Sequence, residues 1–184
     1  MFEIKILSSA HITPQFLLHF HHRQEITEKW VKRNHTWQLV DSTDLREWDA
    51  EKRLWIPEYL REQIARGGTV AAAYENDTLV GFGCLDGVLA GQTAKHANLT
   101  MLFVDDTRKR QGIGTTLFAA LCTRAAAMGA DKLFISAIPS AETVAFYFNL
   151  GCVDANEHIP AFLDTEEDRP LEHILAKNHF PQEV

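Results

Sequence analysis

The sequence has no long apolar run and no secretory signal at its start. No stretch of the chain approaches the roughly 20 apolar residues that a membrane-spanning helix needs. The opening residues, MFEIKILSSA, lack the basic and then apolar layout of a signal peptide and are typical of a β-strand. We therefore expect a cytoplasmic protein with no membrane partner. The length of 184 residues predicts a single domain, residues 1–184.

Cysteine is scarce as well. The three cysteines, Cys84, Cys122 and Cys152, lie in apolar segments and form no CxxC pair. This pattern excludes a disulfide framework and a zinc ribbon, and it predicts buried, reduced thiols.

The chain also has no excess of positive charge. A net charge of −7 argues against a nucleic-acid partner, whereas a cationic small molecule would be attracted. His19, His21 and His22 form the densest group of histidines, and on a helix His19 and His22 would share a face. Since no Cys, Asp or Glu completes a ligand set, we predict solvated surface there and no metal.

Hydrophobic periodicity predicts a mixed α/β domain that contains a strand–helix–strand unit, with helices long enough to cover both faces of a central sheet. The expected strands are 2–7, 69–74, 78–86, 97–104, 133–138, 152–153 and 171–176, with a turn at 75–77 and a loop at 87–95. The expected helices are 15–32, a segment that follows the polar cluster 41–44, another that starts at Pro57 and ends at Gly67-Gly68, then 112–128 and 141–150.

The most informative segment is a basic, glycine-containing turn between an apolar strand and a long helix. The first amides of a helix are unpaired and carry a partial positive charge, so they bind phosphate well. Gly112 and Gly114 remove side chains that would keep an anion from the backbone. Residues 108–110 add three cations, and Thr115 and Thr116 add hydroxyl groups. This arrangement predicts a diphosphate site.

Two common phosphate motifs do not fit this turn. Leu117 occupies the third glycine position of the dinucleotide pattern GxGxxG, and no Gly-Lys-Ser/Thr follows as a Walker loop requires. The segment Lys109-Arg110-Gln111-Gly112-Ile113-Gly114 instead resembles the acetyl-CoA loop Arg/Gln-x-x-Gly-x-Gly/Ala of the GNAT superfamily of acetyl-CoA-dependent N-acetyltransferases. Lysine stands in the first position, where it keeps the charge but loses the planar fork of arginine.

A second segment strengthens the resemblance. Residues 140–152 are similar to the family pattern Asn-x-x-Ala-x-x-Phe-Tyr-x-x-Leu-Gly-Phe. Phe146-Tyr147 and Leu150-Gly151 match, whereas Ser140 replaces the asparagine and Cys152 the final aromatic residue. The resemblance extends from about residue 69 to 152, and two motifs at the expected separation are more specific than either alone.

The resemblance implies a GNAT-type acyl-CoA N-acyltransferase fold, with a mostly antiparallel twisted sheet and helices on both faces. In this family the strand before the loop splays from its neighbour and holds the pantetheine arm of acetyl-CoA, which assigns that role to Leu102, Phe103 and Val104. Residues 109–115 would hold the diphosphate, and Ser140 would hydrogen-bond CoA. The co-substrate expected is acetyl-CoA, without a metal.

Direct transfer needs a polarised carbonyl, an acid for the departing thiolate and a proton acceptor for the amine. The backbone N–H near Val104 can polarise the carbonyl. By its motif position, Tyr147 would protonate the CoA sulfur; the alternative is an aromatic residue that only packs beside Phe146.

The proton acceptor is less clear from the sequence. Some family members carry a glutamate six residues ahead of the position of Val104, but this chain has Asn98, which takes up no proton. Strand alternation groups His96 with Asn98, Thr100, Leu102 and Val104, and it assigns 97, 99, 101 and 103 to an apolar core face. His96 is therefore a candidate that acts through water, unless it is a solvent-facing residue at a strand start. Asp86 and Glu25 are weaker candidates.

These observations predict an N-acetyltransferase that acts on the primary amine of a small molecule or peptide, such as a polyamine, an aminoglycoside or a lysine-like amine. One alternative is a catalytically silent acyl-CoA-binding module of the same fold, and a nucleotide-phosphate binder is a remoter one. Core packing accounts for most of the tryptophans, and one or two can form an aromatic wall for the acceptor. They are Trp30, Trp37, Trp48 and Trp55. Homodimers are frequent in this family.

Overall fold

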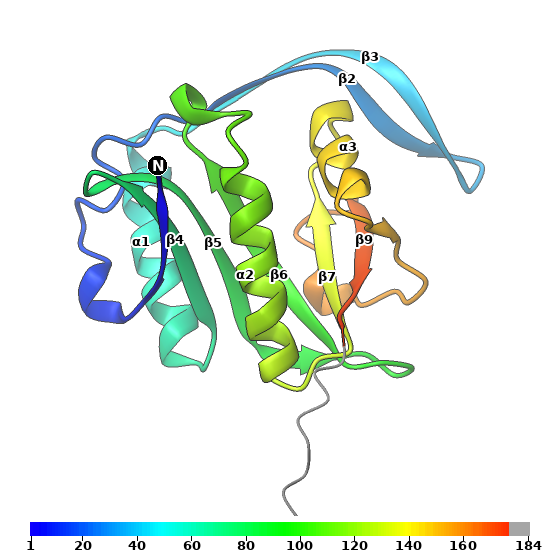
Figure 1. Ribbon diagram of the computed structural model, residues 1–184. Helices are drawn as coiled ribbons and strands as arrows, with labels where there is room; N and C mark the ends of the chain where they lie inside the picture. Colours follow the sequence, from blue (N-terminus) through cyan, green and yellow to red (C-terminus); the bar gives the residue numbers. More distant parts are fainter. Residues whose placement is uncertain (177–184) are drawn as a thin grey trace, which may run out of the picture.

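A seven-stranded sheet forms the centre of the protein (Figure 1), in a computed structural model that describes residues 1–176. The strands lie in the order β1-β4-β5-β6-β7-β9-β8, and all neighbours are antiparallel except β6 and β7. Their bounds are β1 Glu3–Leu7, β4 Thr69–Glu75, β5 Thr78–Ala90, β6 His96–Val104, β7 Lys132–Ala137, β8 Val153–Asp154 and β9 Arg169–Ile174. The predicted mixed α/β fold with a mostly antiparallel sheet is confirmed.

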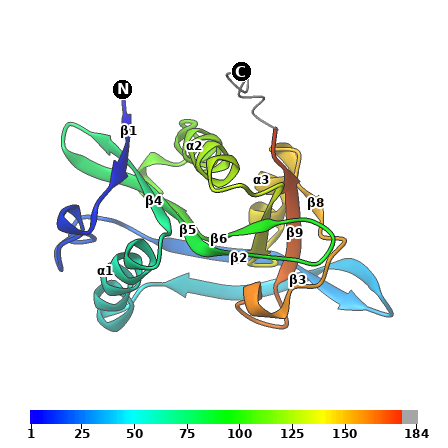
Figure 2. The ribbon, with the colours of Figure 1, turned by 90° about the horizontal axis from the view of Figure 1, so that it is seen from below.

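Helices cover both faces of this sheet, as Figure 2 shows. Helix α1 (Ala50–Ala65) lies on one face, and α2 (Ile113–Ala127) and α3 (Ala141–Asn149) lie on the other. Strand β4 is buried on both sides: Val70 packs in the core under α1, while Ala71 packs in the core under α2. None of the helices formed by residues 1–176 is both long enough and apolar enough to span a bilayer.

Strands β6 and β7 are the parallel pair of the strand–helix–strand unit, and they stay paired over a short distance. The register joins His96–Asn98 to Lys132–Phe134 and then stops, whereas β6 remains paired with β5 up to Val104. The edge of β6 from Leu99 to Val104 therefore turns its free backbone groups toward a widening gap beside β7. This is the splay that the sequence resemblance implied.

A β-bulge at Thr100 corrects the predicted alternation of β6. The register with β5 passes from Leu99 directly to Met101, which leaves Thr100 as an extra residue. Since a bulge shifts the facing of all later residues, the apolar face is divided between two cores. Leu99 packs under α2, but Met101 and Phe103 contribute to the core under α1. The prediction of one continuous apolar face was wrong.

A long two-stranded arm replaces the helix predicted for residues 15–32. Strands β2 (Arg23–Arg33) and β3 (Thr36–Glu47) form a separate antiparallel sheet, and Asn34 and His35 adopt the left-handed backbone of a tight hairpin turn. Leu17 and Phe20 are buried ahead of the arm, which explains the misleading helical spacing of apolar residues. The histidines at 19, 21 and 22 consequently share no helix face.

The remaining boundaries agree with the prediction to within about two residues, with three exceptions. The cluster 41–44 lies in β3, and Asp49 caps α1 instead by accepting a hydrogen bond from the Lys52 amide at 2.7 Å. Helix α1 then continues through Pro57, which tertiary burial tolerates inside the helix. The hairpin of β4 and β5 turns at Asn76-Asp77 as expected, and β5 extends to Ala90, into the predicted loop.

Candidate active site

The N-terminus of α2 is open toward solvent and suited to an anion. Gly112 caps the helix with a φ of 79°, and the first helical hydrogen bond runs from the Thr116 amide to the Gly112 carbonyl at 3.0 Å. The amides of Ile113, Gly114 and Thr115 therefore have no partner within the helix. A Cβ at Gly112 would meet no atom within 4 Å, so space for a ligand lies beside it.

Gly114 lies where the predicted motifs meet. A Cβ at this position would lie 3.2 Å from Cζ of Phe146 and 3.5 Å from Cγ2 of Val104. The end of β6, the start of α2 and the side chain of α3 thus converge on one glycine, and no larger residue fits without movement. A ligand that carries both a diphosphate and a pantetheine arm needs two adjacent backbone segments, one for the phosphates and one for the arm. The start of α2 and the end of β6 meet this requirement.

The cations of the loop are not equally available. Arg108 Nε donates to Glu75 Oε2 at 2.9 Å, and Lys109 Nζ lies 2.7 Å from Asp106 Oδ1. Arg110 is exposed, with a φ of 65° that turns the chain into the helix. The predicted ligands Arg110, Gln111 and Thr115 are accessible around the helix start, whereas the Thr116 hydroxyl donates to the Gly112 carbonyl at 3.0 Å.

Tyr147 is buried between α2 and α3. Its ring lies 6.1 Å from that of Phe118 and 5.1 Å from that of Phe146, and 7% of the residue is exposed. Burial raises the pKa of its hydroxyl above the ordinary tyrosine value, with a contribution from Cys152. The hydroxyl therefore stays protonated at neutral pH, which is the state that a proton donor needs.

Ser140 forms part of the protein scaffold. It caps α3 by accepting a hydrogen bond from the Thr143 amide at 3.1 Å, and its hydroxyl donates to Thr143 Oγ1 at 2.8 Å. Gln24 Nε2 of the arm donates to Ser140 Oγ at 3.1 Å. Because Ser140 is 2% exposed and its hydroxyl is fully engaged, the structure gives no direct support to the predicted CoA contact.

His96 lies at the opposite end of β6 from the α2 loop. Strand β6 is nine residues long, so its two ends lie about 26 Å apart. His96 is completely buried, with Nδ1 3.1 Å from the Ala94 carbonyl and Nε2 3.4 Å from Glu172 Oε2. It therefore faces neither the cleft nor the solvent, which corrects both positions expected from the sequence. Since both ring nitrogens are engaged inside the fold, we do not assign it a role in proton transfer.

The weaker candidates for the proton acceptor are also engaged elsewhere. Glu25 is an exposed arm residue paired with Arg23 at 2.7 Å. Asp86 accepts a hydrogen bond from the Val88 amide at 3.1 Å, which stabilises the irregular end of β5. No three His, Cys, Asp or Glu side chains gather into a possible metal site within residues 1–176.

The arm crosses the C-terminal ends of β6 and β7, as Figure 1 shows. At its base, the His21 amide donates to Asp105 Oδ2 at 2.7 Å, immediately after β6. Further along, the Trp30 amide donates to the Pro139 carbonyl at 2.7 Å, immediately after β7. The arm thereby ties together the two strands that the splay separates. Sequence reasoning missed it because these contacts join distant residues.

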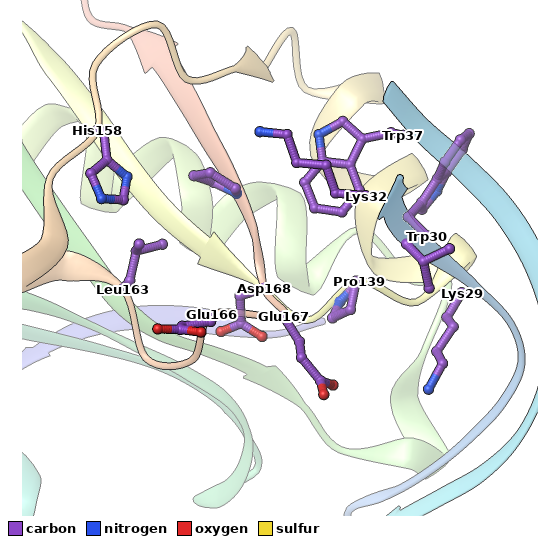
Figure 3. Close-up of a pocket in the computed structure, with 12 residues that line it drawn as sticks. Lys29, Trp30, Lys32, Trp37, Pro139, His158, Leu163, Glu166, Glu167 and Asp168 are labelled. Atoms are coloured by element: carbon purple, nitrogen blue, oxygen red, sulfur yellow. The ribbon is translucent and has the colours of Figure 1, made fainter. Parts of the chain in front are cut away.

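A cavity of about 410 Å³ lies between the arm and the segment that precedes β9 (Figure 3). Trp30 and Trp37 lie on the side of the arm, while Glu166, Glu167 and Asp168 lie on the other side. Core packing, predicted for most of the four tryptophans, holds for Trp48 alone, which is buried and stacked 5.7 Å from Phe20. Trp55 is exposed, and Trp30 and Trp37 line the cavity. The cavity lining combines these aromatic and acidic side chains with Lys29 and Lys32, and the Arg169 guanidinium lies over the rings of Trp30 and Trp37 at 4.7 and 5.0 Å.

The splayed parallel pair and the open N-terminus of α2 are the two features that the resemblance to the N-acetyltransferases implied. The family model described as the acetyltransferase (GNAT) family matches residues 25–151, more than half of the chain. The chain belongs to this family, and it is an acyltransferase.

Solved structures show the same fold. Nourseothricin acetyltransferase is 12% identical with a TM-score of 0.65 (93% of this chain and 95% of that chain covered). The PaiA N-acetyltransferase of Thermoplasma acidophilum in complex with coenzyme A is 17% identical with a TM-score of 0.60 (95% and 99%). The ribosomal-protein-S18-alanine N-acetyltransferase of Escherichia coli is 16% identical with a TM-score of 0.59 (100% and 100%). A search of curated protein sequences returned no significant match.

Proposed function

We propose that this protein transfers the acetyl group of acetyl-CoA to a primary amine of a small molecule or peptide by direct attack. The observation that carries the proposal is the convergence of Val104, Gly114 and Phe146 where the free edge of β6 meets the open start of α2. The amides of residues 113–115 would hold the diphosphate. The free backbone of Leu102–Val104 would hold the pantetheine arm and polarise the thioester carbonyl.

In this reaction the unprotonated amine nitrogen bonds to the carbonyl carbon and gives up a proton to solvent, and the carbon–sulfur bond breaks. Tyr147 donates its phenolic proton to the departing CoA sulfur and later recovers a proton from solvent. The proposed products are an N-acetyl amine and free CoA. The acceptor would approach from the side of the arm, where the cavity presents Trp30, Trp37 and three carboxylates.

The relatives guide the choice of acceptors to test. The names of the similar structures include antibiotic acetyltransferases and an alanine N-acetyltransferase of a ribosomal protein. We propose an assay of thiol release from acetyl-CoA with nourseothricin, kanamycin, spermidine and a peptide with an amino-terminal alanine. Acetylation of at least one amine, confirmed by mass spectrometry, is the expected result. Tight CoA binding without acetylation of any of the four would favour the silent acyl-CoA-binding module instead.

A further inference from the structure

The outer part of the arm has little hydrophobic support of its own. Of the residues in β2 and β3, Ile26 is the only buried one, and it lies near the base of the arm. A two-stranded hairpin in water is marginally stable at best. The arm nevertheless projects over α3 and past the edge of the sheet (Figure 1). Contacts with the rest of the protein must therefore hold its outer part in place.

Two tryptophans on one face of the arm make such contacts. Trp30 pairs with Leu39 across the hairpin, so Trp37, two residues before Leu39, is its diagonal neighbour on the same face. Both rings lie against the guanidinium of Arg169, the first residue of β9, whose Cζ is 4.7 Å from the ring centre of Trp30 and 5.0 Å from that of Trp37. The ring centre of Phe148 in α3 also lies 5.0 Å from this carbon. One guanidinium therefore joins the arm to β9 and α3.

The guanidinium of Arg169 is itself held by Asp154 of β8. Nε donates to Asp154 Oδ1 at 2.6 Å, and Nη2 donates to Asp154 Oδ2 at 2.8 Å, so the pair is bidentate and fixes the plane of the group. The Arg169 side chain is 7% exposed, and a charge with so little water around it needs such a partner. A lysine would keep the charge but lose the planar fork and the stacking surface. The contacts therefore require an arginine at position 169.

The two tryptophans that Arg169 holds are also a wall of the cavity. Trp30 and Trp37 line it from the arm, whereas Asp168 and Pro170, the sequence neighbours of Arg169, line it from the other side. Arg169 thus joins the two walls. Because one wall belongs to a marginally stable arm, the cavity keeps its shape only while the arm stays in place.

We propose that Arg169 is a positioning residue for the acceptor: through Trp30 and Trp37 it holds the arm in place and keeps the cavity ready to receive an amine. The inference rests on the proposed function, in which the acceptor approaches through this cavity. Arg169 acts through the arm and takes no part in the chemical step. Its loss should therefore affect the arm and the binding of the acceptor, but not the binding of CoA.

The first test follows the arm directly and needs no substrate. Arg169→Met keeps a long side chain but removes the charge, and Arg124→Met makes the same change on the exposed surface of α2. In hydrogen exchange measured by mass spectrometry, peptides from residues 29–39 should exchange about 10-fold faster in Arg169→Met, because the aromatic contacts of the cation are lost. Peptides from α2 and β4 should exchange as in the wild type, and Arg124→Met should leave all of them unchanged.

A second variant keeps this test decisive if Arg169→Met does not fold. Asp154→Asn removes the partner of the guanidinium at a side chain that is 50% exposed, so the fold should tolerate it. Residues 29–39 should exchange faster in this variant too, by a smaller factor than in Arg169→Met, because the rings remain in contact with a less firmly held cation.

Kinetics separate a positioning residue from one that only stabilises the fold. With the best acceptor of the four-amine panel, Arg169→Met should raise the KM for the acceptor about 5-fold, while kcat and the Kd for CoA stay close to the wild-type values. Arg169→Lys should lie between the wild type and Arg169→Met. Combining Arg169→Met with Trp30→Ala should raise the KM no further than the more impaired single variant, because both changes remove the same contact.

Three outcomes would count against these proposals. Unchanged exchange of residues 29–39 in both Arg169→Met and Asp154→Asn would overturn the role of Arg169. Faster exchange spread evenly over β7, β9 and the arm, with an unchanged KM for the acceptor, would overturn it as well, because that pattern belongs to a residue that only stabilises the fold. A wild type that acetylates none of the four amines would instead contradict the proposed function, whereas the exchange of the arm would still show whether Arg169 holds it.

Discussion

The α2 side and the α1 side of the sheet are built from contacts of different range. On the α2 side, the phosphate loop, the end of β6 and α3 all come from residues 102–152. The arm, in contrast, is held against this unit by long-range bonds: Gln24 bonds Ser140, which is 116 residues away, and His21 bonds Asp105, which is 84 residues away. The α2 side is thus a nearly continuous piece of chain, whereas the arm, α1 and the segment before β9, which complete the other side, come from distant parts of the chain.

This difference separates two tasks within one enzyme. A local unit can bind the shared co-substrate with few residue types, because backbone amides and glycines supply most of the recognition. The arm and the segment before β9 can vary in sequence without disturbing that unit. We therefore expect substitutions on the α2 side to affect CoA binding or chemistry strongly, and substitutions in the arm to affect the acceptor more mildly.

The largest effect is expected at Tyr147. Tyr147→Phe should lower kcat about 100-fold, because the ring still packs against Phe118 while the proton for the sulfur is lost. Steady-state kinetics should show this loss with an unchanged Kd for CoA. Tyr74→Phe, in β4, is the matched control and should retain activity. Full activity of Tyr147→Phe would leave Tyr147 with a packing role alone.

Gly114→Leu should weaken CoA binding about 30-fold, or about 2 kcal/mol, by isothermal titration calorimetry. The new side chain would enter the space of Phe146 and Val104 and displace the helix start. Ala119→Leu places the same side chain on the exposed surface of α2 and should bind CoA normally. Equal affinity of both variants would mean that the α2 loop does not hold CoA.

Short-range patterns explain why much of the α2 side could be predicted from the sequence. The helix 112–128, the strand before it and the Phe146-Tyr147 segment all follow from local spacing and composition. Boundaries there differ from the structure by about one residue, within the usual fraying of element ends.

The α1 side could not be predicted in the same way, for physical reasons. The apolar residues from Phe16 to Trp30 fit a helix by spacing, but Ile26 and Trp30 are strand residues whose pairing partners lie beyond the Asn34-His35 turn. The bulge at Thr100 leaves no sequence signal, yet it reverses the facing of Met101 and Phe103. The segment before β9 likewise meets β7 through a long-range contact, in which the Asp164 amide donates to Ser136 Oγ, 28 residues away.

In the arm, Trp30→Ala should raise the KM for the acceptor about 5-fold, equivalent to about 1 kcal/mol, because it removes one wall of the cavity and the ring on which the Arg169 guanidinium rests at 4.7 Å. The kcat and the Kd for CoA should change little, because the Trp30 backbone bond to Pro139 is kept. Leu45→Ala, elsewhere on the exposed arm, serves as the control. A change in CoA affinity with Trp30→Ala would contradict the division between the two sides.

The smallest effect on activity is expected at His96. His96→Gln should keep kcat and both KM values but lower the free energy of unfolding by about 1 to 2 kcal/mol, because the Glu172 carboxylate loses a buried partner. Urea denaturation measures this loss, with the exposed His35→Gln as control. A large fall in kcat without loss of stability would return His96 to the catalytic site.

Glu172 itself predicts how stability depends on pH. Burial acts to raise its pKa, but hydrogen bonds from Lys132 and His96 outweigh it and hold the pKa below the ordinary glutamate value. The folded chain therefore binds fewer protons at this site than the unfolded chain does. The stabilisation is present above the ordinary glutamate pKa and is lost as the pH falls through the lowered one. Unfolding of Glu172→Gln should show a weaker dependence on acidic pH.

A crystal structure with CoA bound is the most direct test of the central claim that the splay and the α2 N-terminus form the co-substrate site. We predict the diphosphate within hydrogen-bond distance of the amides of Ile113, Gly114 and Thr115, and the pantetheine arm along Leu102–Val104 between β6 and β7. A diphosphate bound in the cavity beside Trp30 and Trp37, with the α2 loop unchanged, would contradict it.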